Sequence, residues 1–288
     1  MKKFLATALA VIASIATLGF TACNDPVDAD ADVVKVIDVK LTDEEYAFVA
    51  KKNNTALVED FNAFLADFKA QGKFAEYVAK YFEGAGEKVG YDVTTTDVQN
   101  TDSNFIVATN CPFEPFEYLG DDGKIYGLDI EIAAAYAQAK NLTLVVKNIG
   151  FDDIFTQVEA GYADIGMAGI TVSADREALY GFTTKYYQAS QKLIVAADNT
   201  DFDNCKTAAD VEAVLSSLTG KKFGYQIGTT GGMYVVGDAD WGYDGFANLE
   251  GKGYQTAQDA VVDLINGNIY AVVVDEAPAN ALVKAANS

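Results

Sequence analysis

Two side chains in this sequence are suited to holding a small charged molecule. Arg176 is the only arginine, and every other basic residue is a lysine. A planar guanidinium binds a carboxylate through two parallel hydrogen bonds, for which lysine is a poor substitute. Asp275 ends the apolar run 271–274, where a carboxylate is either a turn former or the partner of an ammonium group. If Asp275 has the second role, the two together would suit a ligand that carries both a carboxylate and an ammonium group.

A glycine-rich stretch offers a further place for an anion. Thr229 and Thr230 follow Gly228 and the apolar strand expected at 223–226. Backbone N–H groups at the helix start expected there bind a carboxylate. The stretch is not a phosphate-binding loop, because the Lys-Ser/Thr pair that would complete one is absent.

The composition excludes several kinds of chemistry. The chain has no histidine, which removes Ser-His and Cys-His nucleophilic pairs and histidine-based zinc sites. No EF-hand loop or other spaced acidic motif occurs. We therefore expect no catalytic residue, no metal and no cofactor.

Charge and length set the broad class. The 42 acidic residues outnumber the 21 basic ones, so the net charge of −21 argues against nucleic acid or anionic membrane surfaces as partners. Half of the 288 residues are hydrophobic, which is enough for two α/β lobes with separate cores.

The N-terminus has the form of a targeting segment. A basic start and the apolar run 4–20 precede Thr21-Ala22-Cys23. Small residues before a cysteine resemble a bacterial lipobox, so we expect a lipoprotein signal peptide at 1–22, lipidation of Cys23, and a flexible tether at 23–32. Phe20 departs from the usual leucine, and the alternative is an ordinary secretory signal with an incidental cysteine.

The two remaining cysteines leave their pairing open. Cys111 and Cys205 are available to form a disulfide in an exported protein, but the sequence does not give their separation. Two free thiols are the favoured interpretation, because the two lobes must move.

The pattern of elements changes along the chain. Residues 55–82 have helical spacing with a break at Gly72, and residues 42–45 have the form of a helix start or turn. Residues 84–104 have the composition of a linker. From Asn104 onward strands and helices alternate, which predicts mainly parallel sheets with ligand sites at strand ends.

Four segments in order carry a family resemblance. They are 113–118 (FEPFEY), 161–176 (GYADIGMAGITVSADR), 228–230 (GTT) and 272–275 (VVVD). Each is weak alone, but their order and spacing over residues 104–288 resemble the family 3 extracellular solute-binding proteins, which serve ABC transporters for polar amino acids. The resemblance implies a two-lobed, periplasmic-binding-protein-like α/β fold of type II, with a mixed, mainly parallel sheet in each lobe.

One anomaly in that resemblance predicts a circular permutation. Residues 41–50, 53–57, 62–65 and 72–82 resemble the C-terminal end of the family, although they precede the matching segments here. Termini that lie close together make such a permutation tolerable. The alternative is an unrelated helical prefix domain.

The permutation predicts the extent of each lobe. Lobe 1 would hold 46–84 and 104–193, and lobe 2 would hold 33–45 and 197–288. The segment 85–103 would be a linker that joins the ancestral ends. Crossings near 46–50 and 193–197 would form the hinge, and 33–39 would be a strand of lobe 2.

The resemblance also implies the roles of the ligand-binding residues. Arg176 would bind the ligand carboxylate with N–H groups of Thr229 and Thr230, and Asp275 would bind its ammonium group. The strand end before Arg176 would add backbone and hydroxyl contacts, and two aromatic rings would enclose the ligand side chain. These further residues are Ala168, Gly169, Thr171, Phe113 and Phe151.

The ligand side chain is less defined. Asn110 stands where many relatives carry Asp, and a neutral amide favours a polar uncharged ligand over a cationic one. Glu114 and Gln226 are candidates to face the pocket, whereas Asp164 corresponds to a structural turn position and is not assigned to the ligand.

The expected function is capture of a polar amino acid outside the cytoplasm by a monomer. The protein would be anchored to a membrane by its lipid and would deliver the ligand to an ABC transporter permease. Two alternatives stay open, because a fold does not fix a function. One is a dehydratase-like enzyme on the same fold, and the other is a ligand-sensing module.

Overall fold

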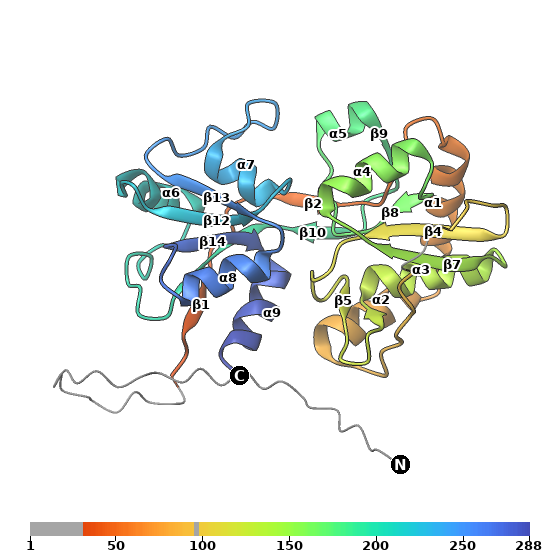
Figure 1. Cartoon of the computed structure of the whole chain (residues 1–288), viewed down its shortest axis with the longest axis horizontal. Coiled ribbons are helices and arrows are strands. Elements are labelled where there is room, and N and C mark those ends of the chain that lie inside the picture. The colour runs from red at the N-terminus through yellow and green to blue at the C-terminus, as the bar shows by residue number, and fades with distance from the viewer. Residues whose placement is uncertain (1–30, 95–97) are drawn as a thin grey trace, which may run out of the picture. The chain divides into compact units, whose positions relative to one another are not determined.

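The computed structural model describes residues 31–94 and 98–288. The expected signal peptide 1–22, the lipidation site Cys23 and most of the tether 23–32 lie outside these residues. Asp32–Ser288 forms one compact unit, which is built around two five-stranded sheets (Figure 1). None of the described helices is both long and apolar enough to span a bilayer.

We call the part around the first sheet lobe 1. The strands lie in the order β7-β4-β8-β3-β9, and β4 runs parallel to both of its neighbours while β3 runs antiparallel to both of its own. The strands are β3 (Val49–Lys51), β4 (Asn104–Thr109), β7 (Thr143–Asn148), β8 (Ile165–Gly166) and β9 (Tyr180–Phe182). The helices of lobe 1 are α1 (Thr55–Ala70), α2 (Lys73–Val78), the π-helix η1 (Ala79–Glu83), α3 (Leu128–Ala139), α4 (Phe151–Ala160) and α5 (Ala174–Leu179), and a small hairpin joins β5 (Tyr118–Leu119) to β6 (Ile125–Tyr126).

We call the part around the second sheet lobe 2. Its strand order is β1-β11-β14-β12-β13, with β12 parallel to both neighbours and β11 antiparallel to both. The strands are β1 (Val34–Ile37), β11 (Gln191–Ala196), β12 (Lys222–Gln226), β13 (Glu250–Tyr254) and β14 (Ala271–Asp275). The helices are α6 (Ala208–Ser217), α7 (Thr230–Val236), α8 (Ala257–Ile265) and α9 (Glu276–Ala286).

The sequence patterns account for most of these elements. Helix α1 begins after Asn54, whose side chain accepts a hydrogen bond from the N–H of Leu57, and it buries Phe61, Leu65 and Phe68 against the lobe 1 sheet. The expected strand at 33–39 is confirmed as β1, which pairs antiparallel with β11 at the edge of the lobe 2 sheet. Both sheets are mixed, but half of the strand pairings in each are antiparallel, so "mainly parallel" overstates their character.

The chain passes between the two sheets on a two-stranded ladder. Strand β2 (Glu44–Tyr46) lies between β1 and β3 in the chain and pairs antiparallel with β10 (Tyr187–Ala189), which lies between β9 and β11. These crossings fall a few residues before the expected hinge segments 46–50 and 193–197. The segment 42–45, with its expected helix start or turn, instead leads into β2, because β10 offers it a pairing partner.

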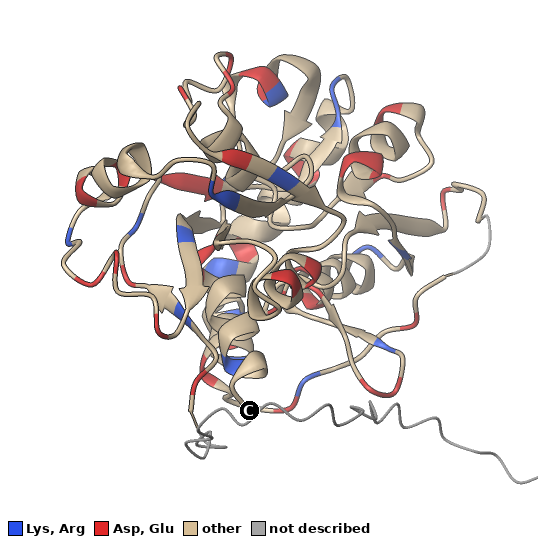
Figure 2. Cartoon of the chain, turned by 60° about the vertical axis from the view of Figure 1, so that its left-hand side comes forward, with Lys and Arg blue, Asp and Glu red and all other residues tan. Residues whose placement is uncertain are grey.

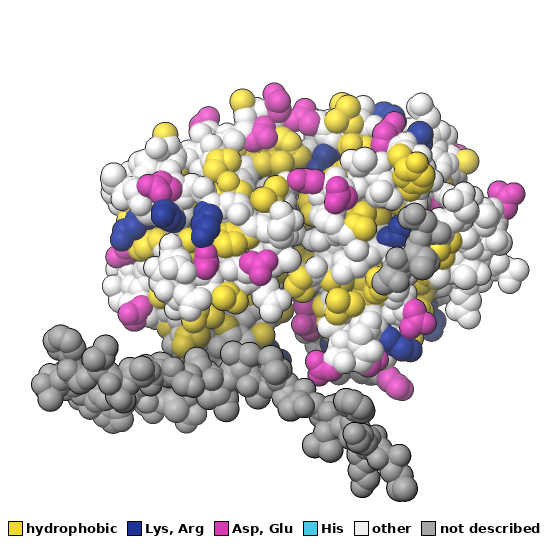
Figure 3. All heavy atoms as spheres, in the orientation of Figure 1, with side chains coloured by type: hydrophobic (Ala, Val, Ile, Leu, Met, Phe, Trp, Pro, Cys, Tyr) yellow, Lys and Arg dark blue, Asp and Glu magenta, His cyan; other side chains and the backbone are white. Residues whose placement is uncertain are grey.

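The described surface carries mixed charge. Acidic residues are spread along the ribbon of both lobes, with basic residues between them (Figure 2). Apolar, acidic and basic side chains are also interspersed on the face shown in Figure 3.

Candidate functional site

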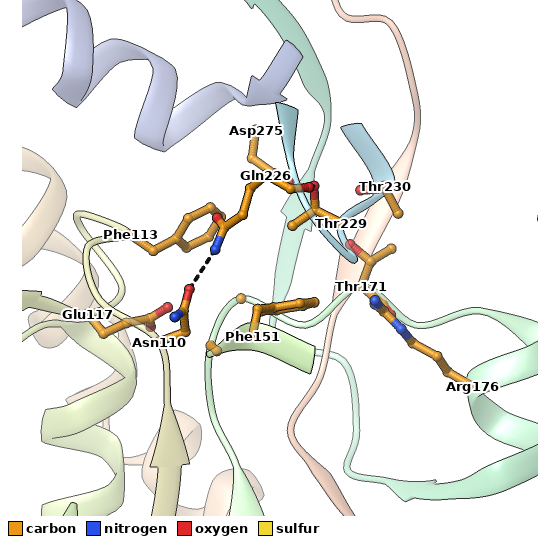
Figure 4. Close-up of a pocket in the computed structure, with 12 residues that line it drawn as sticks. Asn110, Phe113, Glu117, Phe151, Thr171, Arg176, Gln226, Thr229, Thr230 and Asp275 are labelled. Carbon is orange, nitrogen blue, oxygen red and sulfur yellow. Dashed lines mark hydrogen bonds between the residues drawn. The ribbon is translucent and has the colours of Figure 1, made fainter. Parts of the chain in front are cut away.

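A narrow cavity between the lobes collects the residues that the sequence singled out. About 320 Å³ of empty space lies between its lining atoms, and this volume includes space that is open to solvent. All ten predicted ligand-binding residues line it, and Glu117 and Gln226 complete the lining (Figure 4). The twelve residues are Asn110, Phe113, Glu117, Phe151, Ala168, Gly169, Thr171, Arg176, Gln226, Thr229, Thr230 and Asp275.

Arg176 enters the cavity from the first turn of α5. Ser173 caps this helix by accepting a hydrogen bond from the N–H of Arg176 at 3.2 Å. The buried guanidinium donates to the carbonyl of Thr171 at 2.8 Å and to that of Gly228 at 3.1 Å. Burial lowers the pKa of Arg176 to about 10. The negative charges of Glu44, Asp152 and Asp275 nearby act in the opposite direction and raise this pKa. The side chain therefore stays charged at neutral pH, with further N–H donors for a carboxylate.

Asp275 faces the cavity from the end of β14. It is buried, and it accepts a hydrogen bond from the hydroxyl of Tyr46. Burial, followed by the charge of Glu44, raises the pKa of Asp275 to about 7, although the bond from Tyr46 acts in the opposite direction. A ligand ammonium group at this place would stabilise the ionised carboxylate.

Glu44 is a buried carboxylate beside the cavity that the sequence analysis did not assign. Its Oε2 accepts hydrogen bonds from the hydroxyls of Thr171 and Thr230, each at 2.8 Å, and its Oε1 accepts one from Thr42 at 2.7 Å. Both cavity hydroxyls donate their protons to Glu44, and the oxygen of Thr230 also accepts a hydrogen bond from the side-chain amide of Gln191 at 2.9 Å. A hydroxyl oxygen has two lone pairs, so each of the two oxygens keeps at least one for a ligand. Thr171 and Thr230 are thus suited to accepting hydrogen bonds from an ammonium group.

Glu117 is the second carboxylate that the sequence analysis missed. It is fully buried at the cavity wall, and neither carboxylate oxygen has a hydrogen-bond partner among the described residues. Burial, followed by the charge of Asp129, raises the pKa of Glu117 well above its usual range. Glu117 lies at the opposite end of the lining from Arg176 in Figure 4. A buried carboxylate without a partner is costly, so this end of the cavity suits a hydrogen-bond donor, above all a cationic one.

Asp129 adds negative charge behind Glu117. It lies in the first turn of α3, accepts hydrogen bonds from the hydroxyl of Tyr186 at 2.8 and 2.9 Å, and receives the N–H of Gly169 at 3.2 Å. Burial raises the pKa of Asp129 to about 7. The N–H of Gly169 is therefore directed at Asp129 rather than at a ligand.

Asn110 and Gln226 join the lobes across the cavity. The side-chain amide of Gln226 donates to the side-chain oxygen of Asn110 at 2.7 Å, and Asn110 donates to the carbonyl of Ile149 at 2.6 Å. Both ends of the Asn110 amide are thus engaged within the protein. This explains how Asn110 lines the cavity while its polarity is largely satisfied.

Two aromatic rings and a glycine shape the middle of the cavity. Phe113 and Phe151 both line it and lie between Glu117 and Arg176 in Figure 4. Gly169 has a φ of +53°, and a Cβ at this position would lie 2.5 Å from a ring carbon of Phe113. Only glycine fits there, because both the backbone conformation and the close approach of the ring exclude a side chain.

The remaining sequence candidates divide between cavity and surface. Thr229 lines the cavity and donates its hydroxyl to the carbonyl of Gln226 at 2.8 Å. Glu114 is half-exposed and lies 3.9 Å from the ammonium group of Lys88, outside the cavity lining. Asp164 accepts hydrogen bonds from the N–H of Ile106 at 2.7 Å and from Asn100 at 2.8 Å, which agrees with a structural role. Cys111 and Cys205 are both free thiols.

Comparison with known proteins decides the family. The model of the bacterial extracellular solute-binding proteins, family 3, matches residues 105–282. The chain belongs to this family. Its cavity between two α/β lobes is where such a fold places a ligand.

Relatives and solved structures extend the match. ABC transporter arginine-binding protein 1 of Escherichia coli K12 is 30% identical over 181 residues, which cover 63% of this chain and 66% of that protein. The histidine-binding periplasmic protein of the same strain is 27% identical over 62% of each chain. A solved structure of an ancestral arginine-binding protein bound to arginine matches with a TM-score of 0.55 at 29% identity. The match covers 65% of this chain and 76% of the ancestral protein. The match spans less than two thirds of either curated relative.

Proposed function

We propose that this protein captures an amino acid with a cationic side chain between its lobes and delivers it to an ABC transporter. The observation that carries the proposal is Glu117, a fully buried carboxylate at the cavity wall whose two oxygens lack hydrogen-bond partners among the described residues. The relatives named as arginine- and histidine-binding proteins support the same class of ligand.

The charges of the cavity match such a ligand group by group. Arg176 would bind the α-carboxylate, Asp275 the α-ammonium group, and Glu117 the side-chain cation. In Figure 4 the rings of Phe113 and Phe151 lie between the two ends, where the aliphatic part of the ligand would pass. Charges taken out of water must be paired, and this ligand would pair all three.

Asn110 alone favoured an uncharged ligand, and Glu117 reverses that preference in our proposal. The amide of Asn110 is occupied by Gln226 and by the carbonyl of Ile149, so it has little capacity left to select a ligand. Glu117, in contrast, has both oxygens unpaired. An unpaired buried carboxylate discriminates more strongly than a satisfied amide.

Binding without catalysis is the second part of the proposal. The curated relatives are named as binding proteins, which supports this part. Incubation of the protein with each amino acid that it binds should return that amino acid unchanged, as measured by mass spectrometry. A new product would favour the dehydratase-like alternative.

Location outside the cytoplasm follows from the same family, and we propose a lipid anchor at Cys23. The periplasmic relative supports an extracytoplasmic site of action. A Cys23→Ala variant should move the protein from the membrane fraction to the soluble extracytoplasmic fraction. An unchanged distribution would contradict the anchor. A monomer that docks on a permease completes this part of the proposal.

We further propose that the chain is a circular permutant of the family. The family match covers 105–282, yet earlier segments supply β1 at the edge of the lobe 2 sheet and β3 inside the lobe 1 sheet. Asn287, after α9, hydrogen-bonds the start of β1: its Oδ1 accepts from Val33 at 3.0 Å, and its amide donates to the carbonyl of Val34 at 2.9 Å. This contact supports an ancestral connection from α9 into β1.

Reordering the chain tests the permutation. A variant that begins at Asn104 and continues from Ser288 into residues 33–84 should fold with the same far-ultraviolet circular dichroism spectrum and bind the same ligand within a few-fold. Failure to fold would indicate that residues 33–84 are a prefix specific to this chain order.

A ligand panel tests the function itself. The purified protein, unfolded and refolded to remove carried ligand, would be melted with each of the twenty amino acids, with citrulline, and with agmatine. Ligand at a hundredfold excess over its Kd adds about 2.7 kcal/mol of stability. We expect a clear shift with one or more cationic amino acids, and none with agmatine, which lacks the carboxylate for Arg176. Stabilisation by neutral amino acids alone would contradict the cationic class.

A further inference from the structure

The only arginine and the only tryptophan of the chain meet across the two lobes. Arg176 belongs to α5 of lobe 1, and Trp241 lies in the loop after α7 of lobe 2. The guanidinium carbon is 4.7 Å from the centre of the tryptophan ring. A guanidinium and an aromatic face attract each other within about 6 Å, most strongly when the aromatic side chain is tryptophan.

Arg176 is held differently by each lobe. Within lobe 1 its guanidinium lies 4.9 Å from the ring centre of Phe155 and 5.6 Å from that of Phe151, and it donates to the carbonyl of Thr171. From lobe 2 it contacts the ring of Trp241 and the carbonyl of Gly228. The lobe 1 contacts lie within one lobe, whereas the lobe 2 contacts depend on the two lobes lying together.

The loop that carries Trp241 is internally braced. Asp238 and Tyr243 exchange two backbone hydrogen bonds at 2.8 and 2.9 Å, and the N–H of Trp241 donates to the carbonyl of Asp238 at 3.2 Å. At the base, a Cβ on Gly245 would lie 2.3 Å from the backbone nitrogen of Gly237, so the two ends of the loop are in close contact. The ring is therefore presented by a defined turn.

Trp241 itself is not part of the cavity lining. Its half-buried ring covers the guanidinium beside the cavity rather than the space for a ligand. A role through Arg176 is therefore more consistent with its place than a direct ligand contact.

We propose that Trp241 is a positioning residue that latches lobe 2 onto Arg176 once the guanidinium has bound the ligand carboxylate. This inference rests on the proposed function. Closure brings the Trp241 ring over the guanidinium and excludes water from the guanidinium. The ring also holds the N–H donors of the guanidinium toward the carboxylate. Water exclusion strengthens the Arg176–carboxylate bond, because the local dielectric constant falls.

The latch acts after encounter, so it affects dissociation. Trp241→Leu should release L-arginine about 5- to 30-fold faster than the wild type, which is the range of a partly desolvated cation–π contact. The association rate should change by less than about twofold, because the open protein already presents Arg176. Trp241→Phe keeps an aromatic face and should restore most of the slow release.

Radiolabelled L-arginine provides the readout for every variant, including those without tryptophan. Dissociation is followed by a chase with unlabelled L-arginine, the equilibrium Kd is measured by dialysis, and the association rate follows from the two. In the wild type, emission of the single tryptophan should also shift with L-arginine along the same saturation curve.

The outcomes separate the latch from the function. Binding of L-arginine by the wild type together with unchanged release from Trp241→Leu would overturn the latch alone. Equal acceleration in Trp241→Leu and Trp241→Phe would also overturn it, because the aromatic face would then not matter. Absence of binding by the wild type to every cationic amino acid, L-arginine included, would overturn the cationic ligand and the latch together.

Discussion

Exchange of Glu117 for glutamine would convert the cationic end of the cavity into a neutral one. The side chain keeps its size and one oxygen acceptor, while the negative charge is removed. Glu117 is fully buried and its oxygens lack partners among the described residues, so a ligand cation there would gain its hydrogen bonds without competition from another protein donor. The substitution should therefore act on ligand choice more than on folding.

The size of the effect follows from the kind of bond removed. A hydrogen bond to a charged group contributes about 1.5 to 3 kcal/mol, which corresponds to roughly 10- to 150-fold in Kd. We expect Glu117→Gln to raise the Kd for L-arginine by that factor. Citrulline, the uncharged ureido analogue, should bind the variant as well as or better than the wild type, because no buried carboxylate is left unpaired.

Glu114→Gln is the matched control. It removes a carboxylate three residues away in the same segment, but Glu114 is half-exposed, lies near Lys88 and does not line the cavity. Calorimetric titration of both variants and the wild type, each with L-arginine and with citrulline, measures the affinities to be compared. Equal loss in the two variants, or an unchanged arginine-to-citrulline ratio in Glu117→Gln, would refute the assignment.

Three further substitutions probe the rest of the site. Asp275→Asn should abolish tight binding yet stabilise the closed, ligand-free protein by about 2 to 4 kcal/mol above pH 7, because the pKa of Asp275 is raised to about 7. The free energy of unfolding of the wild type falls as the pH rises from about 4 to 7, because Asp275 becomes ionised in its buried place. Urea unfolding should therefore show that the variant is more stable than the wild type at pH 8 but not at pH 4. An equal difference at both pH values would exclude the charge of Asp275 as the cause. Glu44→Gln should weaken binding about tenfold, because Thr171 and Thr230 would lose their shared charged acceptor, and calorimetry showing no change would remove Glu44 from the site. Gly228→Ala should weaken binding several-fold, because its Cβ would lie 1.8 Å from Oδ1 of Asp152 in lobe 1, and an added Asp152→Ala should restore part of it. Gly220→Ala shares the positive φ but meets nothing within 4 Å, so it should lower stability by about 1 kcal/mol without changing the Kd.

The residues that the sequence identified share a clear local signal. Arg176 stands out as the only arginine, and Asp275 stands out as a charge at the end of an apolar strand. The roles of Phe113, Ala168 and Thr230 were implied by the family resemblance, whose motifs are short and contiguous in sequence. Such signals need no knowledge of distant contacts.

The two missed carboxylates depend on contacts that no local pattern contains. Glu44 lies 127 residues from Thr171 and 186 from Thr230, and they meet only because β2 crosses between the sheets. The pattern of its segment predicts a helix start or turn, since acidic residues after a threonine also form caps. Glu114 and Glu117 lie in the same segment, and the path of the chain after Phe113 decides which one faces the cavity.

The crossing strands show the same limit. The segments 46–50 and 193–197 are apolar enough for the hinge, but the chain crosses earlier because β2 and β10 pair with each other and leave β3 and β11 to their sheets. Long-range pairing therefore overrides the local pattern. Trp241 was likewise beyond sequence reasoning, since its contact with Arg176 joins two lobes.

A crystal structure of the protein grown with L-arginine tests the central claim most directly. The account predicts one arginine in the cavity, with its carboxylate on the guanidinium of Arg176, its α-ammonium group on Asp275, and its guanidinium within hydrogen-bond distance of Glu117. An arginine bound in the reverse direction, a side chain that leaves Glu117 unpaired, or a cavity without ligand at saturating concentration would contradict the account.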